Sequence, residues 1–176
     1  MSEHRPPVEP DRRAPERFHV AVIAARWNGA IVERLLEGCL MRLAELGVSA
    51  ERREVFRVPG SLELPVAARA AATCGRFHAV VVLGCVIRGE TWHFEAVAGQ
   101  CVAGVRQVAV ETGVPVIFGV LTVDTEAQAL ARSGGEHGHA GRDAADAAVE
   151  TALTVHRISG TFDRVFGAGS GGGRSG

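Results

Sequence analysis

A continuous apolar run at residues 78–87 constrains the fold of this 176-residue chain more than any other segment. It reads His-Ala-Val-Val-Val-Leu-Gly-Cys-Val-Ile, with no alternation of polar and apolar side chains. Such a strand is typical of parallel sheets, in which helices cover both faces. The run ends in Arg88-Gly89-Glu90-Thr91 and is followed by a helical pattern through Thr112. We therefore predict a buried parallel strand that leads through a glycine turn into a long helix beginning at Thr91.

The same order of strand and helix recurs along the chain. Apolar runs predict strands at residues 18–24, 54–58, 78–87 and 116–122. Helical periodicity predicts helices at residues 28–46, 65–74, 91–112, 125–133 and 141–157. Asn28 is the expected N-cap of the first helix, and Gly47 its expected end. This alternation favours an α/β fold with a four-stranded parallel sheet, whose ligands bind at the carboxyl ends of the strands.

Composition narrows the class of protein. Hydrophobic residues make up 47% and charged residues 22%, which is typical of a globular domain. The net charge is −1 without a basic run, so nucleic acid is not an expected partner. No apolar run reaches membrane-spanning length, and the N-terminus lacks an apolar signal core, so we expect a cytoplasmic protein with no membrane partner. The four cysteines have no CxxC spacing and are expected to be free thiols: Cys39, Cys74, Cys85 and Cys101.

The two ends of the chain differ from its middle. Residues 1–16 are polar and contain four prolines, and we expect a flexible arm there. Residues 161–176 include a Gly/Ser-rich stretch and are expected to form a flexible tail. The folded domain is therefore predicted at residues 17–160.

Unusual residues gather at the predicted strand ends, above all after the third strand. Gly89 allows a ligand to approach the backbone, and Thr91 as an N-cap would place free amides at a helix start, which suits phosphate. His93 is expected one turn into the same helix, close enough to act on a ligand held at the anion site. The alternative is an ordinary turn with an exposed histidine.

Other candidates also have two interpretations. Trp27 could stack on a flat heterocycle or be a half-buried packing residue. Glu63 could bind sugar hydroxyls or only complement a helix dipole. Arg132 could bind phosphate or make a surface ion pair. Residues 136–139, Glu-His-Gly-His, hint at a metal, but no further ligands cluster with them, and we expect no metal site.

The chain contains no lysine, so all nineteen basic residues are arginine. A Schiff base on an enzyme lysine is therefore excluded. A P-loop is excluded as well, because that motif requires a lysine.

Five segments follow one another in a fixed order: Ala25-Arg26-Trp27-Asn28, Val58-Pro59-Gly60-Ser61-Leu62-Glu63-Leu64-Pro65, Ile87-Arg88-Gly89-Glu90-Thr91-Trp92-His93-Phe94, Pro115-Val116-Ile117-Phe118-Gly119-Val120 and Ala131-Arg132-Ser133-Gly134. In order and spacing they resemble the signature of the lumazine synthase (6,7-dimethyl-8-ribityllumazine synthase) family over roughly residues 18–157. The resemblance implies a three-layer α-β-α, flavodoxin-like fold with a four-stranded parallel sheet flanked by helices.

The resemblance also implies an activity in riboflavin biosynthesis. Members of this family condense 5-amino-6-(D-ribitylamino)uracil with 3,4-dihydroxy-2-butanone 4-phosphate, releasing phosphate and water. The substrate amine itself forms the imine, so the absence of lysine is no obstacle. No cofactor and no metal are implied.

The resemblance assigns roles to thirteen residues. His93 matches the proton-transfer histidine. The implied substrate contacts are Trp27 for stacking on the pyrimidine, Ser61, Leu62 and Glu63 for the ribityl chain, Val86 and Ile87 for backbone contacts with the ring, Gly89, Glu90 and Thr91 for the phosphate turn, Phe118 from a neighbouring subunit, and Arg132 and Asp143 for the phosphate.

One departure from the family pattern concerns the phosphate. The second phosphate-site lysine of the family is Ala140 here, and Arg142 or His139 are the candidates to replace it. The loss of a charged contact is expected to weaken phosphate binding more than it changes the chemistry. Two other functions stay open. Ala140 favours a lumazine- or flavin-binding shell protein without turnover. The second alternative is an archaeal-type riboflavin synthase, but residues 87–93 fit that family poorly.

The resemblance further implies a homo-oligomer built from pentamers, with riboflavin synthase as a candidate partner. The short linker at residues 134–141 resembles that of members that close into icosahedral shells. The proline-rich arm, which is poor at joining a neighbour's sheet, resembles that of free pentamers.

Overall fold

The computed structural model describes residues 13–90 and 92–167 and contains a central four-stranded parallel sheet. The strands lie in the order β2-β1-β3-β4 and all run parallel. Their bounds are β1 Val20–Ala25, β2 Arg53–Val58, β3 Ala79–Ile87 and β4 Val116–Val123. The predicted sheet is confirmed, with the long apolar run in its interior between β1 and β4.

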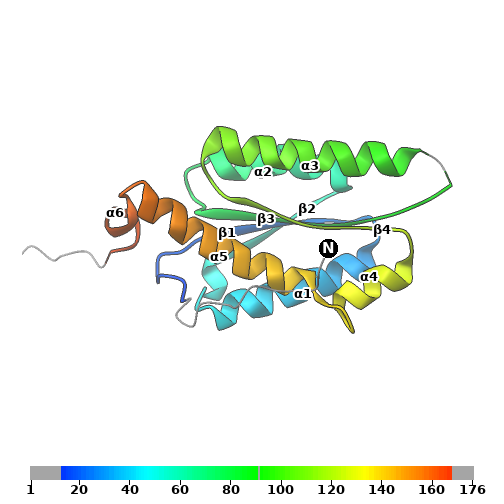
Figure 1. The fold of residues 1–176 in the computed structure, drawn as a ribbon. Helices are drawn as coiled ribbons and strands as arrows, with labels where there is room; N and C mark the ends of the chain where they lie inside the picture. Colours follow the sequence, from blue (N-terminus) through cyan, green and yellow to red (C-terminus); the bar gives the residue numbers. More distant parts are fainter. Residues whose placement is uncertain (1–12, 91, 168–176) are drawn as a thin grey trace, which may run out of the picture.

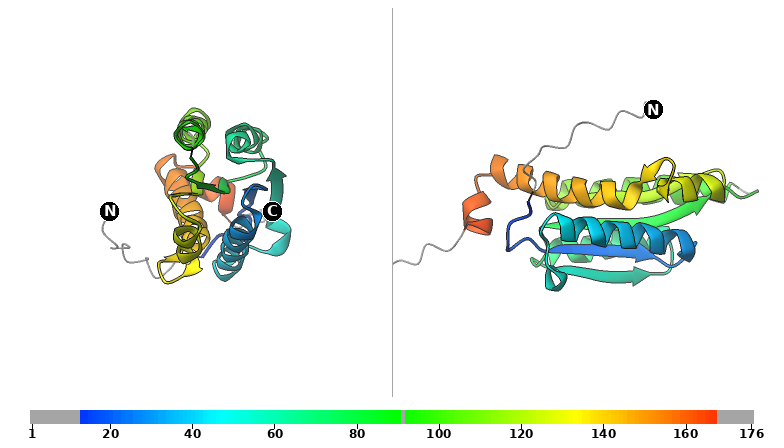
Figure 2. Two further views of the ribbon diagram at one scale, coloured as in Figure 1. Left: turned by 90° about the vertical axis from the view of Figure 1, so that its right-hand side faces the viewer. Right: turned by 90° about the horizontal axis from the view of Figure 1, so that it is seen from below.

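Helices cover both faces of this sheet, as predicted (Figure 1). One layer consists of α2 (Leu64–Thr73) and α3 (His93–Thr112). The other consists of α1 (Gly29–Glu45) and α5 (Ala140–Ile158), with the short α4 (Glu126–Arg132) beside them. Figure 2 shows the three layers end-on and the pairing of α1 with α5 from below. Within the described residues, no helix has the length and apolar character needed to cross a membrane.

Two apolar cores lie on either side of the sheet because successive strand residues face opposite layers. In β3, Val81 and Leu83 pack with α1 and α5, whereas Val80 and Val82 pack with α2 and α3. All four side chains are fully buried. A strand buried on both faces needs apolar residues at every position, which explains the unbroken run.

The long helices begin and end close to their predicted positions. α3 ends at Thr112, where Gly113 adopts the left-handed conformation (φ 70°). It begins at His93 with Trp92 as N-cap, so His93 is the first residue of the helix rather than one turn inside it. The predicted N-cap, Thr91, lies outside the described residues.

Several short elements were not predicted. They are the 3₁₀ turns η1 (Ala50–Arg52) and η2 (Ser61–Glu63), an antiparallel hairpin of β5 (Ser133–Gly135) and β6 (Gly138–His139), and α6 (Phe162–Phe166). The hairpin lies in the segment expected to be a linker, and both Gly134 (φ 103°) and Gly138 (φ 86°) have left-handed backbones.

The packed domain extends past both of its predicted boundaries. Phe166 of α6 is buried against Phe18, with ring centroids 6.1 Å apart, so the segment directly after residue 160 is folded rather than a flexible tail. At the other end, Ala14 is buried and its amide donates a hydrogen bond to the Leu46 carbonyl at 2.7 Å. The rest of the predicted arm and tail, residues 1–12 and 168–176, lies outside the described residues.

Candidate functional site

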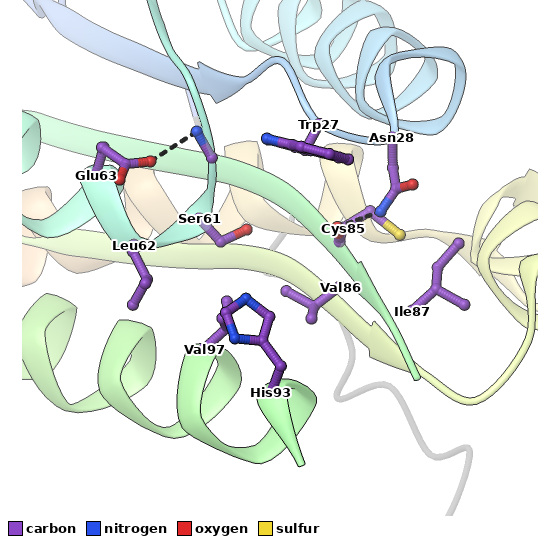
Figure 3. A pocket seen from close by; sticks show the side chains of 11 residues that line it. Trp27, Asn28, Ser61, Leu62, Glu63, Cys85, Val86, Ile87, His93 and Val97 are labelled. Atoms are coloured by element: carbon purple, nitrogen blue, oxygen red, sulfur yellow. Dashed lines mark hydrogen bonds between the residues drawn. The ribbon is translucent and has the colours of Figure 1, made fainter. Parts of the chain in front are cut away.

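A pocket of ≈ 370 Å³ lies at the carboxyl ends of β1, β2 and β3 (Figure 3). This volume suits a small organic ligand, and the position is the one at which parallel sheets bind their ligands. The pocket is lined by Trp27, Asn28, Gly60, Ser61, Leu62, Glu63, Cys85, Val86, Ile87, His93 and Val97. Seven of the thirteen residues expected at the site therefore come together in one cavity.

Trp27 lies on the loop after β1, and hydrogen bonds fix this loop against the end of β2. The Arg26 amide donates to the Val58 carbonyl at 2.9 Å, and the Trp27 amide donates to the Pro59 carbonyl at 3.2 Å. The indole itself is 74% exposed, so it is not a packing residue of this chain. Its face is available for stacking against a planar ligand.

Asn28 joins the same loop to β3, in a way that the sequence did not reveal. It occupies the N-cap position of α1, as predicted, but its side chain makes no capping hydrogen bond. The backbone is left-handed (φ 55°, ψ 43°), and Nδ2 donates to the Cys85 carbonyl at 2.8 Å. The prediction of a side-chain cap is therefore wrong. The long-range hydrogen bond stabilises this conformation and holds the Trp27 loop over the end of β3.

The η2 turn supplies the polar wall of the pocket. Glu63 Oε2 accepts a hydrogen bond from the Gly60 amide at 2.8 Å, which closes the turn (Figure 3). Ser61 is buried beside β3, and a Cβ atom at Gly84 would lie 2.9 Å from its Oγ. The glycine in the middle of the apolar strand therefore lets η2 approach the sheet.

The opposite wall comes from the end of β3 and the start of α3. His93 is exposed at the first position of α3 and points toward Val86 and Ser61 (Figure 3). Val97, four residues later, lies on the same helix face and also lines the pocket. Burial raises the pKa of the Cys85 thiol to about 11, so this cysteine stays protonated at neutral pH and is not a thiolate nucleophile. The ionisable side chains that remain in the described lining are the His93 imidazole and the Glu63 carboxylate.

Five expected residues do not line this pocket, and a sixth, Thr91, lies outside the described residues. Gly89 and Glu90 are exposed just beyond β3. Phe118 is half-buried in the edge strand β4, opposite Val82 in the register.

Arg132 and Asp143 lie in the other helix layer. Arg132 is exposed at the end of α4, and Asp143 is exposed in the first turn of α5. One chain alone thus separates Arg132 and Asp143 from the residues expected to bind the pyrimidine.

The two candidates to replace the missing lysine are both engaged within the chain. Arg142 makes a bidentate ion pair with Glu45 of α1, with contacts of 2.6 and 3.0 Å. These hydrogen bonds, with a further one from Arg42, lower the pKa of Glu45 to about 2. His139 packs against α1 so closely that a Cβ atom at Gly38 would lie 2.1 Å from its ring. Among the described residues, no three His, Cys, Asp or Glu side chains gather in a way that could hold a metal ion.

Four pocket residues were not expected from the sequence: Asn28, Gly60, Cys85 and Val97. For Val97 a signal was present, because it is four residues from His93 on a predicted helix. For Asn28 there was none, since its role depends on contact with a strand 57 residues away.

The pocket combines an exposed indole, a carboxylate on a fixed turn, the backbone of a strand end and an imidazole. Comparison with known proteins identifies one family. The family model of 6,7-dimethyl-8-ribityllumazine synthase matches residues 17–156. A 6,7-dimethyl-8-ribityllumazine synthase of Coxiella burnetii (strain CbuG_Q212) is 50% identical over 141 residues, which cover 80% of this chain and 93% of that protein. A protein of the same name from Xanthomonas oryzae pv. oryzae (strain PXO99A) is 47% identical over 143 residues, 81% of this chain and 92% of that protein. The chain therefore belongs to the 6,7-dimethyl-8-ribityllumazine synthase family.

Proposed function

We propose that this chain is an active 6,7-dimethyl-8-ribityllumazine synthase of riboflavin biosynthesis. It condenses 5-amino-6-(D-ribitylamino)uracil with 3,4-dihydroxy-2-butanone 4-phosphate and releases phosphate and water. The observation that carries the proposal is the convergence of Trp27, Glu63 and His93 on one pocket in a chain of this family.

The pocket suggests how the pyrimidine substrate is held. Trp27 stacks on the ring, and the backbone of Val86 and Ile87 meets its polar edge. The ribityl chain lies along η2, where Glu63 accepts hydrogen bonds from hydroxyl groups in addition to that from the Gly60 amide. The substrate's own amine attacks the ketone, and His93 moves protons as phosphate leaves and the ring closes.

The phosphate side of the site requires a second copy of the chain. Gly89, Glu90 and Thr91 form the phosphate turn of the proposal, with Arg132 as the cation, Asp143 orienting it, and Phe118 closing the pocket. Arg132 and Asp143 lie in the α1/α5 layer, away from His93 at the start of α3. The Arg132, Asp143 and Phe118 side chains of one chain do not line its own pocket. A neighbouring subunit can supply its copies of these three side chains instead.

Self-association has support in the outer surface of α2 and α3. Three valines are exposed there: Val66 by 68%, Val102 by 45% and Val110 by 75%. Exposed apolar side chains on these two adjacent helices favour contact with another copy. The proposed assembly is a homopentamer, which can assemble further into an icosahedral shell.

We also propose a cytoplasmic location, in keeping with four free cysteines. Riboflavin synthase is the candidate partner.

A turnover assay with both substrates and no added metal or cofactor tests the activity. The expected result is formation of 6,7-dimethyl-8-ribityllumazine that a chelator does not abolish. A protein that binds lumazine but forms none would instead be a binding or shell protein of the same fold. A protein that makes riboflavin from lumazine alone would be a riboflavin synthase.

Co-expression of two impaired variants tests the shared site. His93→Ala and Arg132→Ala each damage one half of a site formed between two subunits. In mixed oligomers, roughly a quarter of the sites would combine two intact halves, so activity should rise to about that fraction of the native value. If both halves came from one chain, the mixture would stay as impaired as the two variants alone.

Arg132→Ala alone should raise the KM for the butanone phosphate by roughly ten- to a hundredfold, because a charged phosphate contact contributes about 1.5–3 kcal/mol. Ala140→Lys should lower that KM. An effect of Arg142→Ala on this KM, with Arg132→Ala silent, would place Arg142 in the phosphate site instead.

A further inference from the structure

The start of α3 has no capping side chain among the described residues. Its N-cap residue, Trp92, makes no side-chain capping hydrogen bond and is 77% exposed. His93 is the first residue of the helix, and its side chain makes no hydrogen bond to another described residue. The direction of its imidazole therefore depends on whatever holds the first turn of α3 in place.

Arg88 makes four contacts, two with the end of β4 and the residue after it, and two with the first turn of α3. Its amide donates to the Val123 carbonyl at 2.9 Å, which extends the pairing of β3 with β4 by one step. Nε donates to Asp124 Oδ1 at 2.7 Å, directly after β4. Nη1 donates to Glu95 Oε1 in the first turn of α3, and the guanidinium carbon lies 4.2 Å from the centroid of the Phe94 ring. One side chain thus joins both strand ends to the two residues that follow His93.

We propose that Arg88 is a positioning residue, which holds the first turn of α3 against the ends of β3 and β4 so that His93 faces the pocket. The inference rests on the proposed function, because the purpose of this placement is proton transfer by His93. The planar guanidinium suits the task, since it can bind two carboxylates and stack on a ring at the same time.

Direct binding of substrate phosphate by Arg88 is the competing explanation, and the contacts oppose it. Both carboxylates are engaged with the guanidinium, and Arg88 is absent from the pocket lining. The hydrogen bond from Arg88 also holds the pKa of the Glu95 carboxyl below its ordinary value, so this partner stays ionised at neutral pH. An anion would have to displace two carboxylates that already neutralise the guanidinium.

A double-mutant cycle separates these explanations. Arg88→Ala should lower kcat by roughly tenfold, because a misplaced acid–base group loses part of its contribution, with little change in either KM. In a His93→Ala background the same substitution should have almost no effect, since Arg88 acts through His93. Asp124→Asn should lower kcat in the same way, by a smaller factor.

Arg76→Ala is the matched control. Arg76 also pairs with a carboxylate, Glu54, and its guanidinium carbon lies 5.0 Å from the Phe77 ring centroid, but it precedes β3 at the other end of the sheet. Its loss should leave kcat unchanged. The proposal is overturned if Arg88→Ala raises the KM for the butanone phosphate at constant kcat, or if its effect persists in full without His93.

Amide hydrogen exchange tests the same contacts without turnover. Residues 97–99 carry the first amides of α3 that can bond within the helix. Arg88→Ala should reduce their protection, whereas Arg76→Ala should not. If the native protein made no lumazine, the proposed function would fail. The loss of protection in Arg88→Ala would still support the role of Arg88 in holding the first turn of α3. Unchanged protection would overturn the role of Arg88 whatever the activity.

Discussion

At the scale of single residues, Glu63 connects the fold of the pocket to its chemistry. One carboxylate oxygen closes η2 by accepting the Gly60 amide hydrogen bond. The other makes no hydrogen bond within the described part of the chain, and it is free to accept one from a ligand. The sequence allowed two interpretations of Glu63, local support of a helix start and recognition of sugar hydroxyl groups. Because its two carboxylate oxygens are used differently, Glu63 is compatible with both.

Glu63→Gln should separate these two contributions. A glutamine oxygen can still accept the Gly60 amide, but the charge that strengthens hydrogen bonds from the ribityl chain is lost. The KM for the ribitylaminouracil should rise by roughly tenfold, with kcat and thermal stability nearly unchanged. Steady-state kinetics and a melting curve measure this. Glu63→Ala is the comparison, because it should lose affinity and also melt at a lower temperature. Equal kinetics for Glu63→Gln and the native chain would exclude a charged contact with the substrate.

The sequence indicated which residue types would meet in the pocket, because the ends of parallel strands lie at the same edge of a sheet. Trp27, Glu63 and His93 are examples, although their roles stay predictions. Asn28 was misinterpreted for a physical reason. Its left-handed backbone is compensated by a hydrogen bond to Cys85, and this partner is adjacent only in the folded chain. Arg132 and Asp143 lie in the other helix layer, and they reach the pocket only through the proposed contact between copies. The sequence of one chain does not show which surfaces would meet in such a contact.

At the scale of helices and strands, α5 packs so closely on α1 that one position admits only glycine. A Cβ atom at Gly141 would lie 2.0 Å from the Leu35 carbonyl oxygen, which is part of the α1 backbone and cannot move independently. Gly141→Ala should therefore separate the two helices and lower the free energy of unfolding by roughly 1–3 kcal/mol.

Chemical denaturation measures this change. Thr151→Ala is the matched control, because Thr151 is exposed in the same helix and alanine has the higher helix propensity. A Gly141→Ala protein as stable as the Thr151→Ala protein would show that α5 can shift on α1 without loss.

The docking of α6 should depend on pH. His78 lies between Phe18 and Phe166, with ring centroids at 5.7 and 4.8 Å, and its Nδ1 accepts the His19 amide hydrogen bond. Burial, together with the charge that His156 can carry, lowers the pKa of His78 from 6.5 to about 4. Burial lowers the pKa of His156 as well. Since the unfolded chain takes up the proton first, the stability contributed by neutral His78 is complete above pH 6.5 and is lost as the pH falls toward 4.

His78→Asn should weaken this pH dependence, because the amide oxygen can replace Nδ1 as acceptor but does not titrate. The measurement is the melting temperature of both proteins in a series of buffers from about pH 7.5 to about pH 4. This range covers roughly the interval over which His78 takes up a proton in the unfolded and folded chains. The native protein should lose more stability than the variant over this interval. Parallel curves would show that His78 does not contribute to the acid sensitivity.

The regular elements were predictable because their apolar periodicity is strong, and β3 is the clearest case. The β5–β6 hairpin and α6 were not, for two different reasons. The hairpin consists mainly of glycine and histidine, which have no periodicity, and glycine signals fit a linker equally well. The five residues of α6 are too few to form a helix alone, and they depend on the contact of Phe166 with Phe18 and His78.

At the scale of the whole molecule, the apolar surface of α2 and α3 should determine the assembly. Val66→Arg places a charge where the proposed contact between copies would remove water, so it should shift the protein toward monomers. Light scattering during size-exclusion chromatography measures the mass. Ile158→Arg is the control, because Ile158 is 82% exposed at the end of α5 and away from that surface. An unchanged mass for Val66→Arg would place the contact elsewhere.

The two cores close at different times during synthesis, because of where their helices lie in the chain. α2 and α3 are both complete before β4 leaves the ribosome, so the face that they cover can form as the sheet forms. The opposite face is covered by the first long helix and the last, α1 and α5. A nascent chain that ends before residue 140 therefore still displays the part of that apolar face that α5 covers, and chaperones bind exposed apolar surface of this kind. Release of α5 from the ribosome is thus the step at which a newly made chain changes from a sheet open on one side to a closed domain.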